Sequence, residues 1–141
     1  MMAYIKSEII SSKIRYINKL KIVNPVVANI ALNLAKINII KYITISKDYI
    51  KASSEITIGR IKIPITKIDH LTAVGVSLLL ELDHKIIQFY EINSPVKGYG
   101  SKMVDAVIRA LPDDWEAVVV MDWSGGFWEK MREKHRELII L

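Results

Sequence analysis

Two glycines and a lysine stand close together in the stretch INSPVKGYGS, residues 92–101, between a strand-like run and a helix-like run. The first amides of a helix have no partner within the helix, and its N-terminus carries roughly half a positive charge, so such a turn can bind a phosphate. Gly98 and Gly100 would let the backbone approach this ligand closely, and Lys97 adds a positive charge. An ordinary tight turn is the alternative, because glycines also serve any strand-to-helix connection.

Other chemistries are limited by residue type and spacing. The two common nucleotide loops do not fit, because position 103 is Met rather than the last Gly of GxGxxG, and no Gly-Lys pair is present for GxxxxGK[ST]. The absence of cysteine removes disulfides, thiolate nucleophiles and Cys-ligated metals. His70, His84 and His135 are too scattered to predict a metal site.

The elements that must position the glycine loop follow from the spacing of apolar residues. Asn24 and Pro25 are typical of an N-cap and first helical residue. Helical spacing then predicts helices over about 25–37, 103–111 and from 125 to 135. Alternation or apolar runs predict strands over 43–45, 56–65, 73–82, 85–92, 117–121 and 138–141, with a bulge at 59–60. Residues 3–20 show helical spacing, but residues 13–23 fit a strand equally well, so this segment stays open.

The totals indicate one domain with a substantial core, because the chain has 141 residues of which 51% are hydrophobic. The longest uncharged stretch, residues 22–35, is shorter than the roughly 20 residues of a membrane span and contains three asparagines. The N-terminus does not have the pattern of a secretory signal. We therefore expect a cytoplasmic protein with no membrane partner. The many isoleucines and lysines fit a thermophile or an AT-rich genome.

Positive charge is concentrated in the first half of the chain. Residues 1–70 contain 12 Lys and Arg against 4 Asp and Glu, whereas residues 71–141 contain 8 against 11. Clustered positive charge attracts polyanions through counterion release, so the first half could meet nucleic acid or an acidic partner. Solvated lysines on an ordinary surface are the alternative.

Two segments resemble the GNAT N-acetyltransferase superfamily. VKGYGSKMVDAVI, from Val96, is similar to its acetyl-CoA-binding segment, with the pattern Q/R-x-x-G-x-G/A between a strand and a helix. GFWEKM, residues 126–131, is similar to its late F-Y-E-K-L-G-F segment. The resemblance covers about residues 72–141. It implies a single GNAT-like α+β domain over residues 1–141, with a mixed, mostly antiparallel sheet and helices on both faces; the topology of residues 1–50 stays open.

The resemblance also implies an acetyl-CoA-dependent N-acetyltransferase that needs no metal and transfers an acetyl group to an amine of a protein or small molecule. The loop backbone would hold the pyrophosphate through Val96, Lys97, Gly98, Tyr99, Gly100 and Ser101. The backbone of residues 90–92, with Tyr90 and Ile92, would pair with the pantetheine arm. Asp122, Phe127 and Trp128 would complete the cofactor site, although Asp122 and Ser124 also fit a helix cap and the aromatic face also fits a core.

Amine acetylation needs a base for the amine and a proton source for the leaving thiolate. Glu91 is the predicted general base, with Glu81, His84 or a bound water as alternatives. A non-catalytic carboxylate in a surface ion pair is the other interpretation of Glu91. Tyr90, Tyr99 or solvent would supply the proton, because the indole of Trp128 stands where many family members have Tyr and cannot donate a proton near neutral pH.

Two departures from the family pattern support other functions. Pro95 stands where the loop normally begins with Gln or Arg, and it has no amide proton. Trp128 replaces the Tyr of the late helix. A catalytically silent GNAT-like binding or assembly module is therefore one alternative, and a basic nucleic-acid-binding protein is another. A homodimer is compatible with the sequence.

Overall fold

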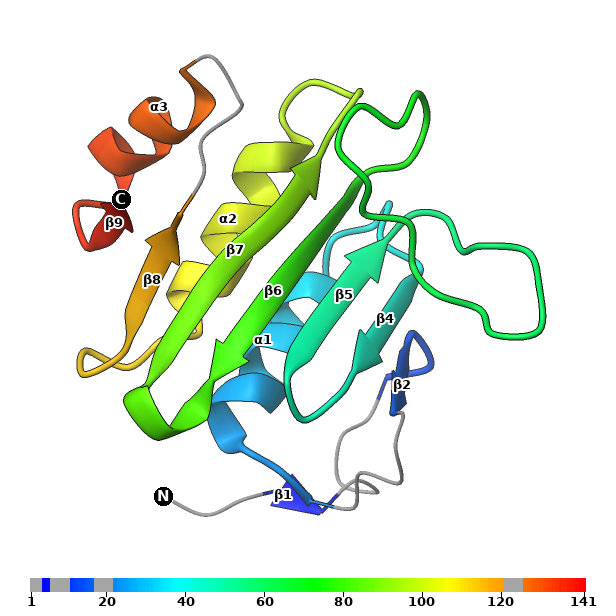
Figure 1. Ribbon diagram of the computed structural model, residues 1–141, viewed down its shortest axis with the longest axis horizontal. Coiled ribbons are helices and arrows are strands. Elements are labelled where there is room, and N and C mark those ends of the chain that lie inside the picture. The colour runs from blue at the N-terminus through cyan, green and yellow to red at the C-terminus, as the bar shows by residue number, and fades with distance from the viewer. Residues whose placement is uncertain (1–3, 6–10, 17–21, 121–125) are drawn as a thin grey trace.

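The computed structural model describes residues 4–5, 11–16, 22–120 and 126–141 (Figure 1). Its helices are α1 (Pro25–Ala35), α2 (Tyr99–Arg109) and α3 (Phe127–Lys134), and a 3-10 turn covers Leu82–His84. Its strands are β1 (Tyr4–Ile5), β2 (Ile14–Tyr16), β3 (Ile22–Val23), β4 (Tyr42–Ile45), β5 (Tyr49–Ser53), β6 (Gly75–Glu81), β7 (Ile86–Asn93), β8 (Glu116–Val119) and β9 (Leu138–Ile140).

Seven strands form one mixed sheet in the order β2-β4-β5-β6-β7-β8-β9, and β1 pairs separately with β3. The strands from β4 to β7 form an antiparallel meander. The β2–β4, β7–β8 and β8–β9 pairs are parallel, as expected where a helix connects two strands. The prediction of a mixed sheet with helices is confirmed; three of the six neighbouring strand pairs in the described sheet are antiparallel, and these include the longest ladders.

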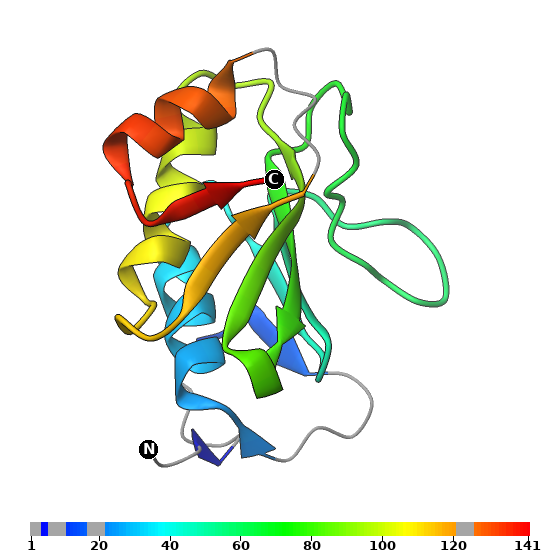
Figure 2. The ribbon, with the colours of Figure 1, turned by 60° about the vertical axis from the view of Figure 1, so that its left-hand side comes forward.

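All three helices lie on the same side of the sheet (Figure 2). One hydrophobic cluster joins Ile30 and Leu34 of α1, Met103 and Val107 of α2, and Trp128 of α3 to the facing side of the strands. The expectation of helices on both faces is therefore wrong. The opposite face carries polar residues instead, and the long connection from β5 to β6 passes beside it.

The polar residues of the opposite face form a row across the sheet. Strand register places Thr44 of β4 beside Lys51 of β5, then Ser77 of β6, then Glu91 of β7. Residues paired in register project from the same face of a sheet. Such a row leaves no broad apolar surface on which another helix could pack.

Local signals explain several elements. Asn24 caps α1, because its Oδ1 accepts a hydrogen bond of 2.8 Å from the amide of Val26, and Pro25 occupies the first turn. The predicted helices over 25–37, 103–111 and 125–135 correspond to α1, α2 and α3, and the predicted strands over 43–45, 73–82, 85–92, 117–121 and 138–141 correspond to β4, β6, β7, β8 and β9.

One predicted strand is wrong. Residues 56–65 form no strand beyond an isolated bridge between Ile56 and Pro64, and β5, which the sequence did not reveal, takes the place beside β6. Pro64 lacks an amide proton and interrupts a ladder, whereas β5 alternates buried Ile50 and Ala52 with half-buried Tyr49 and Lys51. Within the described residues, no helix is both long and apolar enough to cross a bilayer.

Candidate functional site

Strand β7 loses one of its two neighbours partway along its length. It pairs with β8 only as far as Phe89 opposite Val119, whereas its pairing with β6 continues to Asn93 opposite Gly75. A bulge begins there, because Leu78 pairs with Phe89 but the adjacent Ser77 pairs with Glu91, which leaves Tyr90 as the extra residue. The outer edge of residues 90–93 therefore pairs with no strand in the described part of the chain.

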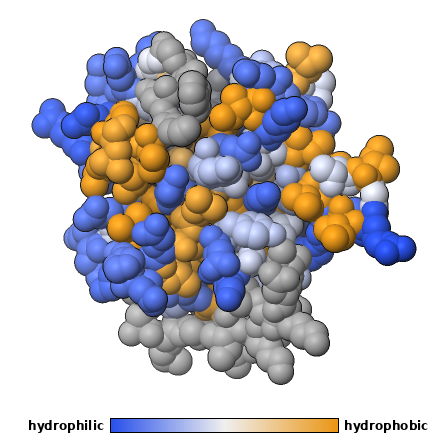
Figure 3. Space-filling model, in the orientation of Figure 1, coloured by the Kyte–Doolittle hydropathy of each residue, from blue (hydrophilic) through white to orange (hydrophobic). Residues whose placement is uncertain are grey.

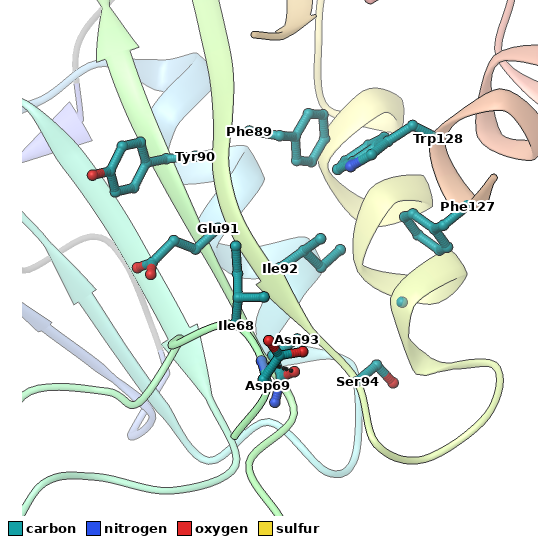
Figure 4. A pocket seen from close by; sticks show the side chains of 11 residues that line it. Ile68, Asp69, Phe89, Tyr90, Glu91, Ile92, Asn93, Ser94, Phe127 and Trp128 are labelled. Carbon is teal, nitrogen blue, oxygen red and sulfur yellow. Dashed lines mark hydrogen bonds between the residues drawn. The ribbon is translucent and has the colours of Figure 1, made fainter. Parts of the chain in front are cut away.

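A pocket of about 340 Å³ opens at this free edge (Figure 4). Its walls come from the end of β7, the first turns of α2 and α3, and the chain that leads into β6. The lining residues are Ile68, Asp69, Phe89, Tyr90, Glu91, Ile92, Asn93, Ser94, Gly100, Phe127 and Trp128.

The bulge sends side chains of β7 to two sides of the pocket. Phe89 and Ile92 point toward α3, whereas Tyr90 and Glu91 point the other way (Figure 4). The ring of Phe89 lies 5.0 Å from that of Trp128, measured between centroids, and Phe127 lies 5.1 Å from Trp128 in an edge-to-face contact. Trp128 is only 4% exposed, so the aromatic cluster makes an apolar wall on the helix side.

Helix α2 begins directly after the loop that is predicted to bind phosphate. Gly98 has a φ of 93°, which L side chains rarely adopt, and the helix begins at Tyr99. The first hydrogen bond from the helix to its cap joins the amide of Lys102 to the carbonyl of Gly98 at 3.3 Å. The amides before it have no acceptor within the helix and are available to an anion.

Gly100 allows close packing between α2 and α3. A Cβ atom at this position would lie 3.0 Å from Cε1 of Phe127. The pocket therefore depends on both glycines for structural reasons, Gly98 through its dihedral angle and Gly100 through the space taken by Phe127.

Glu91 presents its carboxylate on the side of the sheet away from the helices. The hydroxyl of Thr66, which is buried, donates a 3.1 Å hydrogen bond to Glu91 Oε1. The neighbouring Ser77 is also buried, and its hydroxyl has no hydrogen-bond partner among the described residues. Glu91 is thus held in place by a neutral donor, and none of the lining residues in the described part of the chain is positively charged.

A second carboxylate, that of Asp69, lines the same pocket and is placed by Asn93. The side-chain oxygen of Asn93 accepts a 3.1 Å hydrogen bond from the amide of Asp69, which has a φ of 68°. The side-chain nitrogen donates 2.8 Å bonds to the carbonyls of His70 and Ala73. Asn93 therefore ties the chain before β6 to the end of β7 and sets the rim of the pocket.

The structure brings together about half of the residues predicted for the site. Tyr90, Glu91, Ile92, Gly100, Phe127 and Trp128 line the pocket. Val96, Lys97, Gly98, Tyr99 and Ser101 lie in the adjoining loop and first turn of α2 without lining it, and Val96, Lys97 and Pro95 are exposed. Asp122 and Ser124 lie outside the described residues.

Two alternative bases are not near the pocket. Glu81 pairs with Ile86 at the opposite end of β7, and His84 belongs to the 3-10 turn beyond it. Both line a separate shallow depression with Asp48. Among the described residues, no group of three or more histidine or acidic side chains is arranged to hold a metal.

Sequence reasoning missed five lining residues: Ile68, Asp69, Phe89, Asn93 and Ser94. Phe89 and Asn93 could have been found, because the alternation in β7 puts Phe89 on the face of the predicted core and Asn93 just before the glycine loop. Ile68 and Asp69 lie between the predicted strands over 56–65 and 73–82, so no pattern pointed to them. Comparison of the chain with protein-family models, with curated proteins and with solved structures finds no match.

Proposed function

We propose that the chain is an acetyl-CoA-dependent N-acetyltransferase with a GNAT-like fold. The observation that carries the proposal is the coincidence of three features in one pocket: the free edge of β7, the N-terminus of α2, and the aromatic side chains of α3. Of the two motifs that resemble the GNAT superfamily, VKGYGSKMVDAVI covers the loop before α2 and most of α2, and GFWEKM covers the start of α3. This agreement between motif and geometry supports the function more strongly than either alone.

The residues present fit the binding of a phosphate-bearing thioester. The first amides of α2 would hold the pyrophosphate, since helix N-termini favour anions. The unpaired backbone of Tyr90 to Ile92 would form ladder-like hydrogen bonds with the amides of the pantetheine arm. Phe127 and Trp128 would cover the apolar part of the arm. Pro95 has no amide proton, so the first contact of the loop is missing.

The carboxylate of Glu91 is the proposed general base. Bound acetyl-CoA would supply the activated acetyl group. Glu91 would take a proton from the acceptor ammonium, so that the amine nitrogen is free to attack the thioester carbonyl. The proton for the thiol product would come from solvent or from the exposed Tyr90, because Trp128 is buried and its indole does not act as an acid.

A binding module without turnover is the second candidate. It is favoured by the buried position of Trp128 against Phe89, which leaves no acidic hydroxyl at that point of the pocket wall. The basic first half of the chain also keeps nucleic-acid binding as a distinct proposal, to be judged by its salt dependence.

A thermal-shift titration with acetyl-CoA tests the first step. A ligand present at about 100 times its dissociation constant stabilises the folded state by roughly 2.7 kcal/mol, so a clear rise in Tm is expected. Thiol release on addition of an amine then separates an enzyme from a silent module. No shift at millimolar acetyl-CoA would contradict both, and steeply salt-dependent binding of DNA or RNA instead would favour the third proposal.

A further inference from the structure

The connection between β5 and β6 carries a protruding hairpin, residues 57–63, with a defined conformation (Figure 1). The amide of Thr57 donates to the carbonyl of Ile63 at 2.8 Å, and the amide of Ile63 donates to Oγ1 of Thr57 at 2.9 Å. Below these bonds, the amide of Ile65 donates to the carbonyl of Glu55 at 2.9 Å. The guanidinium of Arg15 donates to the carbonyl of Lys62 and ties the hairpin to β2.

Apolar and positively charged side chains stand next to each other on this hairpin. Ile58 is fully exposed and Ile61 is 71% exposed. The space-filling view shows hydrophobic and hydrophilic residues side by side at this edge of the molecule (Figure 3). Arg60, Lys62 and Lys67 are exposed, and no acidic residue occurs from 56 to 68.

The same connection continues from the hairpin into the wall of the pocket. Thr66 donates to the carboxylate of Glu91, and Ile68 and Asp69 line the pocket. The charge therefore changes sign along this connection, from a basic and apolar hairpin to a pocket that has the carboxylates of Asp69 and Glu91 and, among the described residues, no basic lining residue.

We propose that the acceptor is a protein segment in which acidic and aliphatic residues flank the residue that carries the amine. This inference rests on the proposed acetyltransferase function. The amine would enter the acidic pocket, and the flanking residues would cover the isoleucines and pair with Arg60 and Lys62.

Other acceptors fit these features less well. A small amine would fill the pocket and leave the ordered apolar hairpin without a role. A nucleic acid would bring phosphates toward Asp69 and Glu91 and offers little aliphatic surface for Ile58 and Ile61. A chain with both acidic and aliphatic groups beside a positive amine matches both the hairpin and the pocket.

The test uses a random peptide library in which each member has one free amine, at its N-terminus or on a single lysine. The protein and acetyl-CoA are incubated with the library, and the acetylated peptides are sequenced. Asp, Glu and aliphatic residues should be enriched beside the acetylated amine. In the double variant Arg60→Glu/Lys62→Glu the acidic enrichment should disappear, and kcat/KM for the best acidic peptide should fall about tenfold, as expected for two exposed charge pairs.

The control is Lys130→Glu/Arg132→Glu, which makes the same change in net charge at exposed positions of α3. It should keep the preference, and both double variants should keep the acetyl-CoA thermal shift. Acetylation of spermidine but of no peptide, or an acidic preference that survives in the hairpin variant, would overturn the inference while leaving the proposed function intact. Absence of any acetyl-CoA shift in the unmodified protein would overturn both.

Discussion

Glu91 is the residue on which the proposed chemistry depends, and its surroundings give it few other roles. It lines the pocket, accepts one hydrogen bond from Thr66, and has no basic lining residue among the described residues with which it could form a structural ion pair. Replacement by glutamine keeps the size and the ability to accept that bond but removes the basic site. The structural cost of Glu91→Gln should therefore be small.

We predict that Glu91→Gln lowers kcat about 100-fold or more, the usual contribution of a general base, and leaves the acetyl-CoA thermal shift unchanged. Steady-state rates with the best peptide or amine provide the measurement. Glu81→Gln, at the end of β6 opposite the first residue of β7, is the matched control and should retain full activity. An unchanged rate in Glu91→Gln would place the base elsewhere, with bound water as the simplest remaining choice.

Ser101 separates ligand binding from helix stability, because one substitution affects them in opposite directions. It lies in the first turn of α2, which contains no acidic residue. Ser101→Glu would stabilise the helix by about 0.3–1 kcal/mol through the helix dipole, yet would place a negative charge beside the proposed pyrophosphate site.

We expect Ser101→Glu to raise or preserve Tm in the absence of ligand and to weaken acetyl-CoA binding about tenfold, since a like charge in a solvated site costs on the order of 1 kcal/mol. Calorimetric titration measures the affinity, and Ser101→Gln is the control of equal size without charge. Equal affinities for the two variants would mean that the start of α2 is only a structural turn.

At the scale of elements, α1 gives a direct test of the local signals from which helices were predicted. Asn24 caps the helix through its side-chain oxygen. Asn24→Ala should destabilise the protein by roughly 1 kcal/mol in urea unfolding. Asn29→Ala, at an exposed position inside the same helix, should be neutral or slightly stabilising, because alanine is the better helix former. Equal effects at both positions would contradict a specific role for the cap.

Local signals predicted most elements, and tertiary pairing decided the rest. The capping pair Asn24-Pro25 and the apolar spacing of α2 are properties of neighbouring residues, so the sequence displays them. The strand β5 exists because Ile50 and Ala52 find partners on both β4 and β6. Its sequence, YIKAS, is short and partly polar, so it gives a weaker strand pattern than the regular alternation of isoleucines in the hairpin that follows. The alternation therefore predicted a strand in the hairpin and none over β5.

The site shows the same division. The glycine loop and the aromatic start of α3 are contiguous motifs and could be predicted. Asp69 could not, because its position depends on hydrogen bonds between Asn93 and residues twenty or more positions earlier. The bulge at Tyr90 likewise depends on register with β6 rather than on any local residue preference.

At the scale of the whole molecule, the three helices form a single layer, and Asp105 joins α2 to the end of α3 within this layer. Its carboxylate contacts Lys134 Nζ at 2.8 Å and His135 Nε2 at 2.5 Å, at the end of α3. Because α3 begins with Phe127 and Trp128, this ion-pair cluster holds the helix that forms the aromatic wall of the pocket. Asp105 therefore links the stability of the layer to the shape of the site.

The ion pairs between Asp105 and the end of α3 should be sensitive to acid, and the pKa of Asp105 sets this sensitivity. Partial burial raises this pKa, but the hydrogen bonds and charges of Lys134 and His135 outweigh burial and hold the pKa below its ordinary value. A carboxylate whose pKa is lower in the folded than in the unfolded state contributes stability above the unfolded value of about 3.9. That contribution is lost as the pH falls through the lower pKa of the folded state.

We therefore predict that Asp105→Asn destabilises the protein near neutral pH and that the difference from the unmodified protein shrinks as the pH falls through the lowered pKa of Asp105. Urea unfolding, followed by tryptophan fluorescence across this range, measures the difference. Asp113→Asn, at an exposed position after α2, is the control and should show a small, nearly constant difference. A penalty for Asp105→Asn that stayed the same at acidic pH would show that the side chain acts by packing rather than by charge, and α3 would then be held mainly by Trp128 and Met131 in the core.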